Sequence, residues 1–284
     1  MGDIATDWLR FFRGDKAGQN WWDKKKALCR KREAQLVKIT GNGLILGKQS
    51  YETTSRTAYA VHLEYLIKQG NFFYTEEQVL PYQLVRSADG KVRHEAFEKP
   101  VVEKNINPFP VFKQGNQKET HREITYNRLE AVKYAERWWN SYNPEYLRFE
   151  DDCTNYISQC LRAGGSPMWG EPVRERGWWY GSDSWSFSWS VAHSFRWYLS
   201  GSERGIRGIE VETPEELKPG DVICYDFDGD GAWNHTTIVV RKDADNMPLV
   251  NAHTDNSRNR YWSYEDSTAW TPEIQYKFFR IEIN

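Results

Sequence analysis

The hydrophobic pattern of the first hundred residues changes from helical to extended near position 35. Residues 4–33 place apolar side chains in patches at helical spacing, with an interruption near Gly14. Residues 35–97 alternate apolar and polar side chains with a period of two, and turn sequences rich in Gly, Asn and Asp separate the strands that this predicts. The pattern predicts a small α+β domain without a catalytic constellation, in which His62 and His94 are ordinary strand residues.

Residues 99–120 show little periodicity and contain three prolines among several Asn, Gln and Lys residues. This composition is typical of a linker or an extended crossing segment. We therefore expect an N-terminal α+β domain over residues 1–120, linker included, and a second domain over residues 121–284.

The second half places helical patterns before extended ones, which predicts an α+β fold for this domain too. The helical patterns end at breaking sequences such as Asn143-Pro144 and Gly164-Gly165. Helices are expected over about 126–142, 153–163 and 186–199, and strands over 221–225, 235–240, 249–254 and 276–281.

Charge and hydropathy narrow the class of protein. The chain has 284 residues with 38 Lys and Arg against 40 Asp and Glu, and a pI near 6.3, which argues against a dedicated nucleic-acid partner. The basic run 24–32 is accordingly expected to be a solvated helix face. No apolar run is long enough to span a membrane, and no signal peptide is visible at the start, so a cytoplasmic location is the default expectation.

Aromatic residues are abundant, with 14 Trp, 16 Tyr and 13 Phe. We expect most of them in the core, although Trp178-Trp179-Tyr180 and Trp185 could wall a substrate groove. The four cysteines form no CxxC pair, so no metal site, redox pair or other cofactor is indicated.

The acidic turn Asp226, Asp228 and Asp230 fits the opening of a calcium-binding EF-hand loop. The twelfth loop position is Thr237, whereas such a loop needs a bidentate Glu there. A tight polar turn is the favoured interpretation, and calcium binding stays open at this stage.

Cys153 is the cysteine best placed for chemistry, because the first turn of a helix stabilises a thiolate. Cys160 lies two turns deeper, where a thiol normally packs, and the adjacent Asp152 opposes ionisation of Cys153. His235 opens a strand after a Gly-rich turn and is the candidate base. A Cys before a His, in the order helix then strand, is the arrangement of papain-like thiol hydrolases.

The sequence from about 123 to 280 resembles the bacterial "putative amidase domain" family, a branch of the papain-like group that also holds the NlpC/P60 and CHAP cell-wall hydrolases. The motifs that carry the resemblance are Tyr126-Asn127-Arg128, Asn143-Pro144-x-Tyr146, Asp152-Cys153-Thr154-Asn155-Tyr156-x-Ser158-Gln159, Ala163-Gly164-Gly165, Lys218-Pro219-Gly220-Asp221-Val222, Asp226-x-Asp228-Gly229-Asp230-Gly231, His235-Thr236-Thr237-Ile238-Val239 and Ala252-His253-Thr254. The resemblance implies an NlpC/P60-like fold, Cys153 as nucleophile and His235 as general base. It also implies that the target is an amide or peptide bond.

Supporting roles follow from the same resemblance and from strand alternation. Tyr146 resembles a tyrosine that assists the oxyanion in NlpC/P60 enzymes, and the backbone N–H of Cys153 is the natural oxyanion donor. Alternation along 249–254 groups Asn251 with His253, and NlpC/P60 enzymes use a His, Asn or Gln there to orient the base. We expect His253 in that role, with Asn251 second and Asp255 third.

The sequence therefore predicts a cysteine-dependent amide hydrolase that acts on a peptide or on peptidoglycan stem peptides through an acyl-enzyme. The resemblance implies action at the cell wall or outside the cell. Two alternatives remain open at this stage: a non-catalytic glycan-binding module of the same fold, and an acyltransferase that uses the same Cys–His pair. The role of residues 1–120 and the oligomeric state are not predicted.

Overall fold

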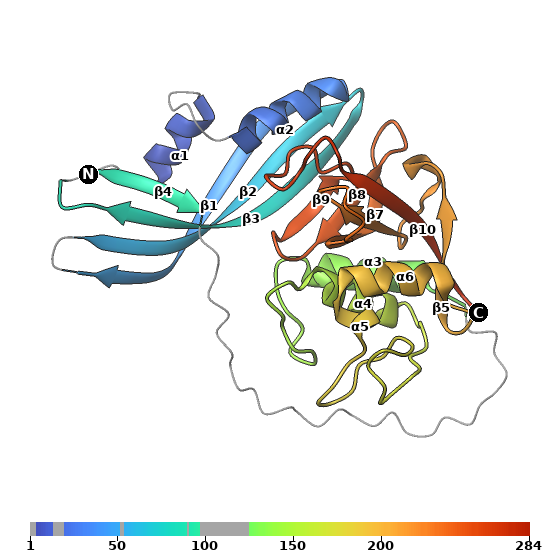
Figure 1. The fold of residues 1–284 in the computed structure, drawn as a ribbon. Helices are drawn as coiled ribbons and strands as arrows, with labels where there is room; N and C mark the ends of the chain where they lie inside the picture. Colours follow the sequence, from blue (N-terminus) through green and yellow to red (C-terminus); the bar gives the residue numbers. More distant parts are fainter. Residues whose placement is uncertain (1–3, 14–19, 52–53, 90, 97–124) are drawn as a thin grey trace. The chain divides into compact units, whose positions relative to one another are not determined.

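A computed structural model describes residues 4–13, 20–51, 54–89, 91–96 and 125–284 (Figure 1). The predicted linker and domain boundary near 120, and the interruption near Gly14, lie outside these residues. The chain divides into two compact units. Unit 1 comprises Met1–Pro100 with Tyr264–Ala269, and unit 2 comprises Val101–Ser263 with Trp270–Asn284.

Unit 1 is a meander of long antiparallel strands with helices packed against it. Strand β2 pairs with β1 and β3, and β3 pairs with β4, as the period of two predicted. The elements are α1 (Ile4–Arg13), α2 (Asn20–Lys31), β1 (Ala34–Ser50), β2 (Ser55–Gln69), β3 (Phe72–Arg86) and β4 (Val92–Ala96).

Helix α2 is anchored on unit 1 by an aromatic stack and a buried ion group. Trp22 stacks on Tyr65 of β2, with ring centroids 6.3 Å apart. The Lys25 ammonium contacts the carboxylates of Glu76 and Asp266, and Lys25 is only 2% exposed. The expectation that this basic run is a solvated face is therefore wrong at Lys25, because acidic partners from β3 and from the 264–269 segment lie beneath the helix.

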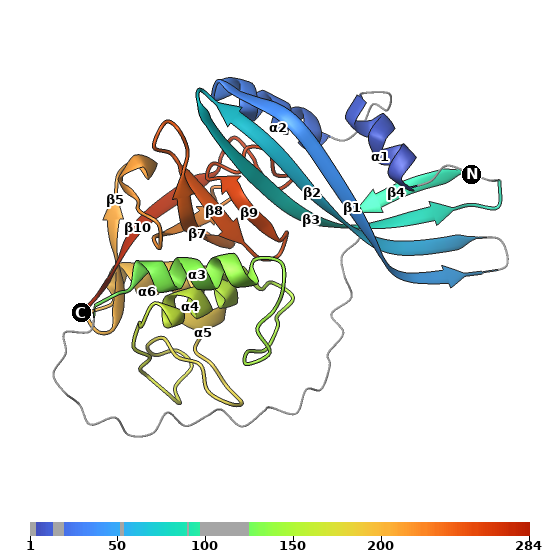
Figure 2. The ribbon, with the colours of Figure 1, turned by 180° about the vertical axis from the view of Figure 1, so that it is seen from behind.

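Unit 2 packs helices against one face of an antiparallel sheet with the strand order β9-β8-β7-β6-β10-β5 (Figures 1 and 2). The α+β class expected from the sequence is confirmed. The helices are α3 (Arg128–Trp138), α4 (Cys153–Ala163), α5 (Phe187–Ser190), α6 (Ala192–Gly201) and the 3-10 turn η1 (Pro214–Glu216). The strands are β5 (Ile206–Val211), β6 (Val222–Asp226), β7 (His235–Lys242), β8 (Pro248–Ala252), β9 (Ser257–Tyr261) and β10 (Gln275–Ile283).

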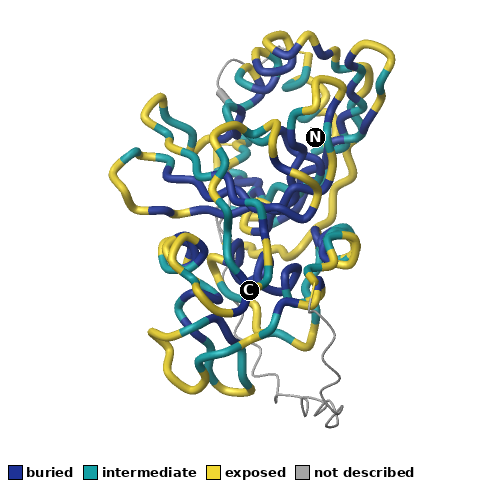
Figure 3. The backbone as a smooth tube through the Cα atoms, turned by 90° about the vertical axis from the view of Figure 1, so that its right-hand side faces the viewer, coloured by how far each residue is buried: buried dark blue, intermediate teal, exposed yellow. Residues whose placement is uncertain are grey.

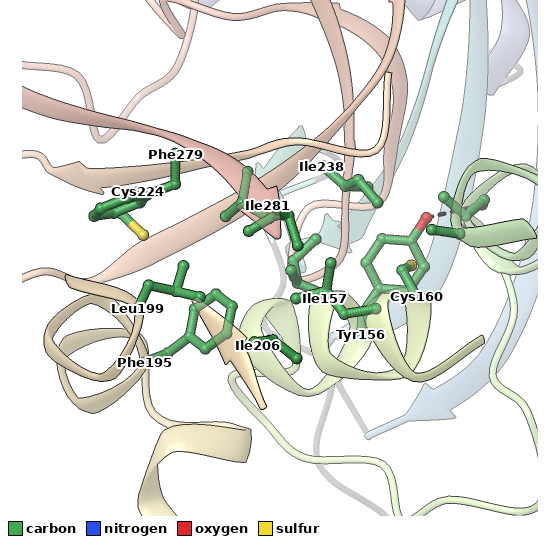
Figure 4. Packing of buried hydrophobic residues seen from close by; sticks show 14 of the residues in the cluster. Tyr156, Ile157, Cys160, Phe195, Leu199, Ile206, Cys224, Ile238, Phe279 and Ile281 are labelled. Atoms are coloured by element: carbon green, nitrogen blue, oxygen red, sulfur yellow. Dashed lines mark hydrogen bonds between the residues drawn. The ribbon is translucent and has the colours of Figure 1, made fainter. Parts of the chain in front are cut away.

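The core of unit 2 lies between α4, α6 and the helix-facing side of the sheet (Figure 4). Tyr156 and Ile157 of α4 are fully buried there, and the Tyr156 hydroxyl donates a hydrogen bond of 2.8 Å to the carbonyl of Ala135 in α3. Ile238 of β7 belongs to the same cluster, so the even-numbered residues at the start of β7 face the helices. The central strands β6 and β8 are buried along their whole length. Figure 3 colours the whole backbone by burial, with exposed segments mostly at the outer loops.

Helix α4 ends where its sequence predicts. Gly164 is the C-cap, and a Cβ at this position would overlap the Tyr126 ring. Gly165 follows with φ +90°, a left-handed conformation that glycine adopts without steric cost. The long helix expected at 186–199 is instead two helices, because Val191 is extended between α5 and α6. None of the helices in the described ranges has the length and apolar character needed to cross a bilayer.

Candidate active site

The Cys153 thiol begins α4 and lies against the start of β7. Its Sγ is 3.7 Å from the Thr154 hydroxyl, which is itself 3.2 Å from the Thr236 hydroxyl. Cys153 is 4% exposed, and burial raises the pKa of its thiol. Hydrogen bonds from Thr154 and Thr236 partly offset that rise in pKa, because they stabilise the thiolate. The site therefore holds a shielded thiol beside two threonines that can donate hydrogen bonds to its thiolate.

The carboxylate of Asp152, directly before the thiol, joins three parts of unit 2. Its Oδ1 accepts hydrogen bonds from the backbone N–H of Phe149 at 3.0 Å and from the Asn155 side chain at 2.9 Å. Its Oδ2 lies 2.7 Å from Nδ1 of His253, and both side chains are 3% exposed. Asp152 makes no capping hydrogen bond to α4, so its role is to connect the helix start with His253.

His253 follows β8 and reaches the helix face of the sheet. Its Nε2 lies 2.8 Å from the Trp138 carbonyl oxygen. A carbonyl only accepts, so Nε2 carries a proton and donates it. The ring stacks on Tyr156 with centroids 3.9 Å apart. Both ring nitrogens are thus occupied by protein groups, and His253 links Asp152 to the end of α3.

His235 opens β7, as expected, but its ring faces away from the thiol. It lies in register opposite Tyr225 and packs on the rings of Tyr225 and Phe227, with centroids 5.5 Å and 5.9 Å away. The next residue, Thr236, contacts α4, so alternation places the His235 side chain on the opposite face of the sheet. Burial and the nearby Arg260 charge lower the pKa of His235 to about 3.

The other predicted support residues have definite partners as well. Asn251 donates to Glu136 of α3 at 2.9 Å and accepts from the Asn259 backbone at 2.9 Å. It therefore ties β8 to α3 and β9, whereas Asp255 is exposed in the turn after His253.

Tyr146 belongs to an aromatic cluster beside α4. Its ring stacks on Trp189 at 5.9 Å and contacts Tyr180 at 5.1 Å. Burial raises the pKa of Tyr146 to about 12, which keeps its hydroxyl protonated and able to donate. Trp178 and Trp179 are at most 1% exposed and pack in the interior of unit 2. Tyr180 and Trp185 are half-buried.

The acidic turn uses its first carboxylate to hold its own backbone. Asp226 accepts hydrogen bonds from the N–H groups of Gly229 and Gly231, at 2.8 and 2.7 Å. Gly229 and Gly231 have φ of +68° and +88°, the left-handed values that this loop requires. Asp230 accepts from Ala232 N–H at 2.8 Å. Two carboxylates of this turn therefore bind the backbone of the turn itself, as in a tight polar turn.

The structure thus pairs His253 with Asp152, the residue before Cys153, and separates His235 from Cys153. His253 was expected to orient His235, but its two ring nitrogens face Asp152 and the Trp138 carbonyl instead. Tyr146 lies in the aromatic cluster beside α4. Sequence reasoning missed Thr236, whose side chain faces α4. Strand alternation puts Thr236 on the same face as Ile238 and Val240, and this could have identified it. The opposite face carries Thr237 and Val239, however, so the sequence does not show which face of β7 is covered by helices.

Comparisons with known proteins cover both units. A family model described as "Putative amidase domain" matches residues 125–279. The chain is similar to the uncharacterized protein YhbB of Bacillus subtilis strain 168, with 47% identity over 268 residues, covering 91% of this chain and 85% of YhbB. The uncharacterized protein YjcM of the same organism is 35% identical over 144 residues, covering 47% of this chain and 32% of YjcM. No solved structure matches.

Proposed function

This chain belongs to the putative amidase domain family, and from that premise we propose that it is a cysteine-dependent hydrolase of amide bonds in peptides. Peptidoglycan stem peptides are the proposed substrate class. The observation that carries the proposal is the Cys153 thiol at the first residue of α4, with the Thr154 hydroxyl 3.7 Å from its sulfur.

The proposed reaction has two halves. A base removes the Cys153 proton, Sγ attacks the amide carbonyl, and the amine leaves with that proton as a thioester forms. Water then attacks the thioester, which releases the carboxylate and restores the thiol. The backbone N–H at the start of α4 is the proposed donor to the oxyanion in both halves, because helix N-termini favour negative charge there.

We assign the base to His235 and the positioning role to His253. The His253 nitrogens already face Asp152 and the Trp138 carbonyl, so His253 holds the helix start in place. The assignment requires the first residue of β7, which adjoins Thr236, to turn its ring toward α4 when substrate is bound. In the described conformation burial lowers the pKa of His235 to about 3 and makes its imidazole a weak base, so the base role also requires a change of environment that raises this pKa when substrate binds.

The tryptophans beside α4 do not favour the glycan-binding alternative, whereas Trp197 of α6 is 55% exposed. Stacking on a sugar needs an exposed ring face, whereas Trp178, Trp179 and Trp189 are at most 1% exposed. The described part of the aromatic cluster therefore serves chiefly to support α4 and the segment around Tyr146.

The test is incubation of the full chain with purified peptidoglycan in ¹⁸O-labelled water, with released fragments resolved by mass spectrometry. Hydrolysis places ¹⁸O in the new carboxylate, whereas transfer to an added amine yields a new amide and no label. Cys153→Ala should release nothing. Release by Cys153→Ala at the wild-type rate would overturn the proposal.

Matched variants of His235 and His253 distinguish the proposed roles of the two imidazoles. His235→Gln should abolish thioester formation, while His253→Gln should lower the rate and retain a measurable turnover. Full activity of His235→Gln beside an inactive His253→Gln would transfer the base role to His253.

A further inference from the structure

One face of the unit 1 sheet carries a compact group of three side chains with metal-ligating atoms: His62, Glu64 and Glu77. Their ligand atoms all lie within 4.8 Å of one another. His62 and Glu64 are two residues apart in β2 and so share a face, and Glu77 of β3 lies in register opposite Glu64. Tyr65, which stacks on Trp22 of α2, lies on the other face. Strand pairing therefore fixes this group independently of α2.

Two carboxylates and one imidazole meet in this group. Glu64 and Glu77 are directly opposed on neighbouring strands, an arrangement of like charges that destabilises a sheet. His62 Nε2 lies 2.8 Å from Glu77 Oε2, so the imidazole and one carboxylate are already in contact. Glu77 is only 8% exposed, so one carboxylate of the group lies largely out of solvent.

We propose that His62, Glu64 and Glu77 bind one divalent transition-metal ion of the Zn²⁺ type. One imidazole nitrogen with carboxylate oxygens is a donor set that such ions accept, with ligand bonds of about 2.0–2.2 Å. Small side-chain rotations bring atoms that lie within 4.8 Å of one another into one coordination shell. Asn42 of β1 lies in register opposite His62 and can supply a further oxygen.

The ion would join β2 to β3 and would stabilise the meander of unit 1. Because the folded strands alone bring the three ligands together, the ion binds the folded chain and raises its unfolding temperature by mass action. This inference is independent of the chemistry at Cys153 and gives unit 1 a binding role of its own.

The test is Zn²⁺ titration of the full chain, free of any histidine tag, followed by calorimetry and by thermal unfolding. Cys153→Ala is the background, so that the thiol does not contribute. One ion per chain should bind, and the unfolding temperature should rise with Zn²⁺. Mg²⁺ should bind far more weakly, because it prefers oxygen ligands alone. No Zn²⁺ binding, or equal affinity for Mg²⁺, would overturn the proposal.

Variants that remove one ligand atom locate the ion. Glu64→Gln and His62→Gln should each weaken Zn²⁺ binding by about tenfold or more and remove the shift in unfolding temperature. The matched control is His94→Gln, since His94 is the imidazole of β4 that pairs with Asp7 outside the group. It should bind Zn²⁺ as tightly as the background protein. Unchanged binding in both group variants would also overturn the proposal.

Discussion

His253 and Asp152 form a buried pair across 101 positions of sequence, with Nδ1 2.7 Å from Oδ2. The pair fixes the residue before the Cys153 thiol to the end of β8. The Trp138 carbonyl holds the other ring nitrogen, so α3 and the sheet together position the start of α4.

The first prediction concerns the energy of this pair. Asp152→Asn or His253→Gln should each lower the free energy of unfolding by about 3 kcal/mol, because each leaves its buried partner without a counterpart. The double variant should lose less free energy of unfolding than the two single variants lose together. Urea unfolding measures all three, with the exposed neighbour change Asp151→Asn as a neutral control. Strict additivity would show that the two side chains do not interact.

The second prediction concerns pH. The folded pKa of His235 is about 3, below its usual value of 6.5, so the unfolded chain takes up a proton first as the pH falls. Stability linked to His235 is complete above pH 6.5 and is lost as the pH falls from 6.5 toward 3, by about 1.4 kcal/mol per unit at most.

The check is the free energy of unfolding of wild type and His235→Gln at several pH values. Between pH 7 and 5 the wild type should lose about 2 kcal/mol more than the variant. Parallel curves would mean that His235 titrates normally in the folded protein.

The third prediction compares neighbouring lysines in α2. Lys25→Met should destabilise the protein by about 3 kcal/mol, because the Glu76 and Asp266 carboxylates stay buried without their cation. Lys26→Met is the control, since Lys26 is 38% exposed and pairs with the exposed Asp23. It should cost no more than about 0.5 kcal/mol. Thermal unfolding of both variants distinguishes them, and equal losses would contradict the buried ion group.

The fourth prediction concerns the acidic turn. Asp226→Ala should destabilise by about 2 kcal/mol, because the N–H groups of Gly229 and Gly231 lose their acceptor. Asp228→Ala, at an exposed position of the same turn, should be nearly neutral. Millimolar Ca²⁺ should leave the unfolding temperature of the wild type unchanged. A calcium-dependent rise that Asp228→Ala removes would restore the EF-hand interpretation.

Local signals in the sequence were sufficient for most helices and strands of unit 2. The apolar stripe of α4 and the Gly164-Gly165 end predicted a helix with Cys153 in its first turn, and the structure begins α4 at that residue. These signals act between near neighbours, through helical spacing and caps, so they are legible without knowing the fold. The short strand β9 carried no such signal, because Ser257–Tyr261 is mostly polar.

The contacts around the thiol depended on tertiary structure. Both faces of β7 carry apolar residues, so the sequence does not show whether His235 or Thr236 faces α4. The pairing of β7 with β6 and the packing of α4 on the sheet decide it. The pairing of Asp152 with His253 likewise joins segments that only the sheet brings together. By itself the sequence determined the α+β class and a cysteine at a helix start. Only packing decided which side chains surround it, because facing and pairing depend on contacts between residues distant along the chain.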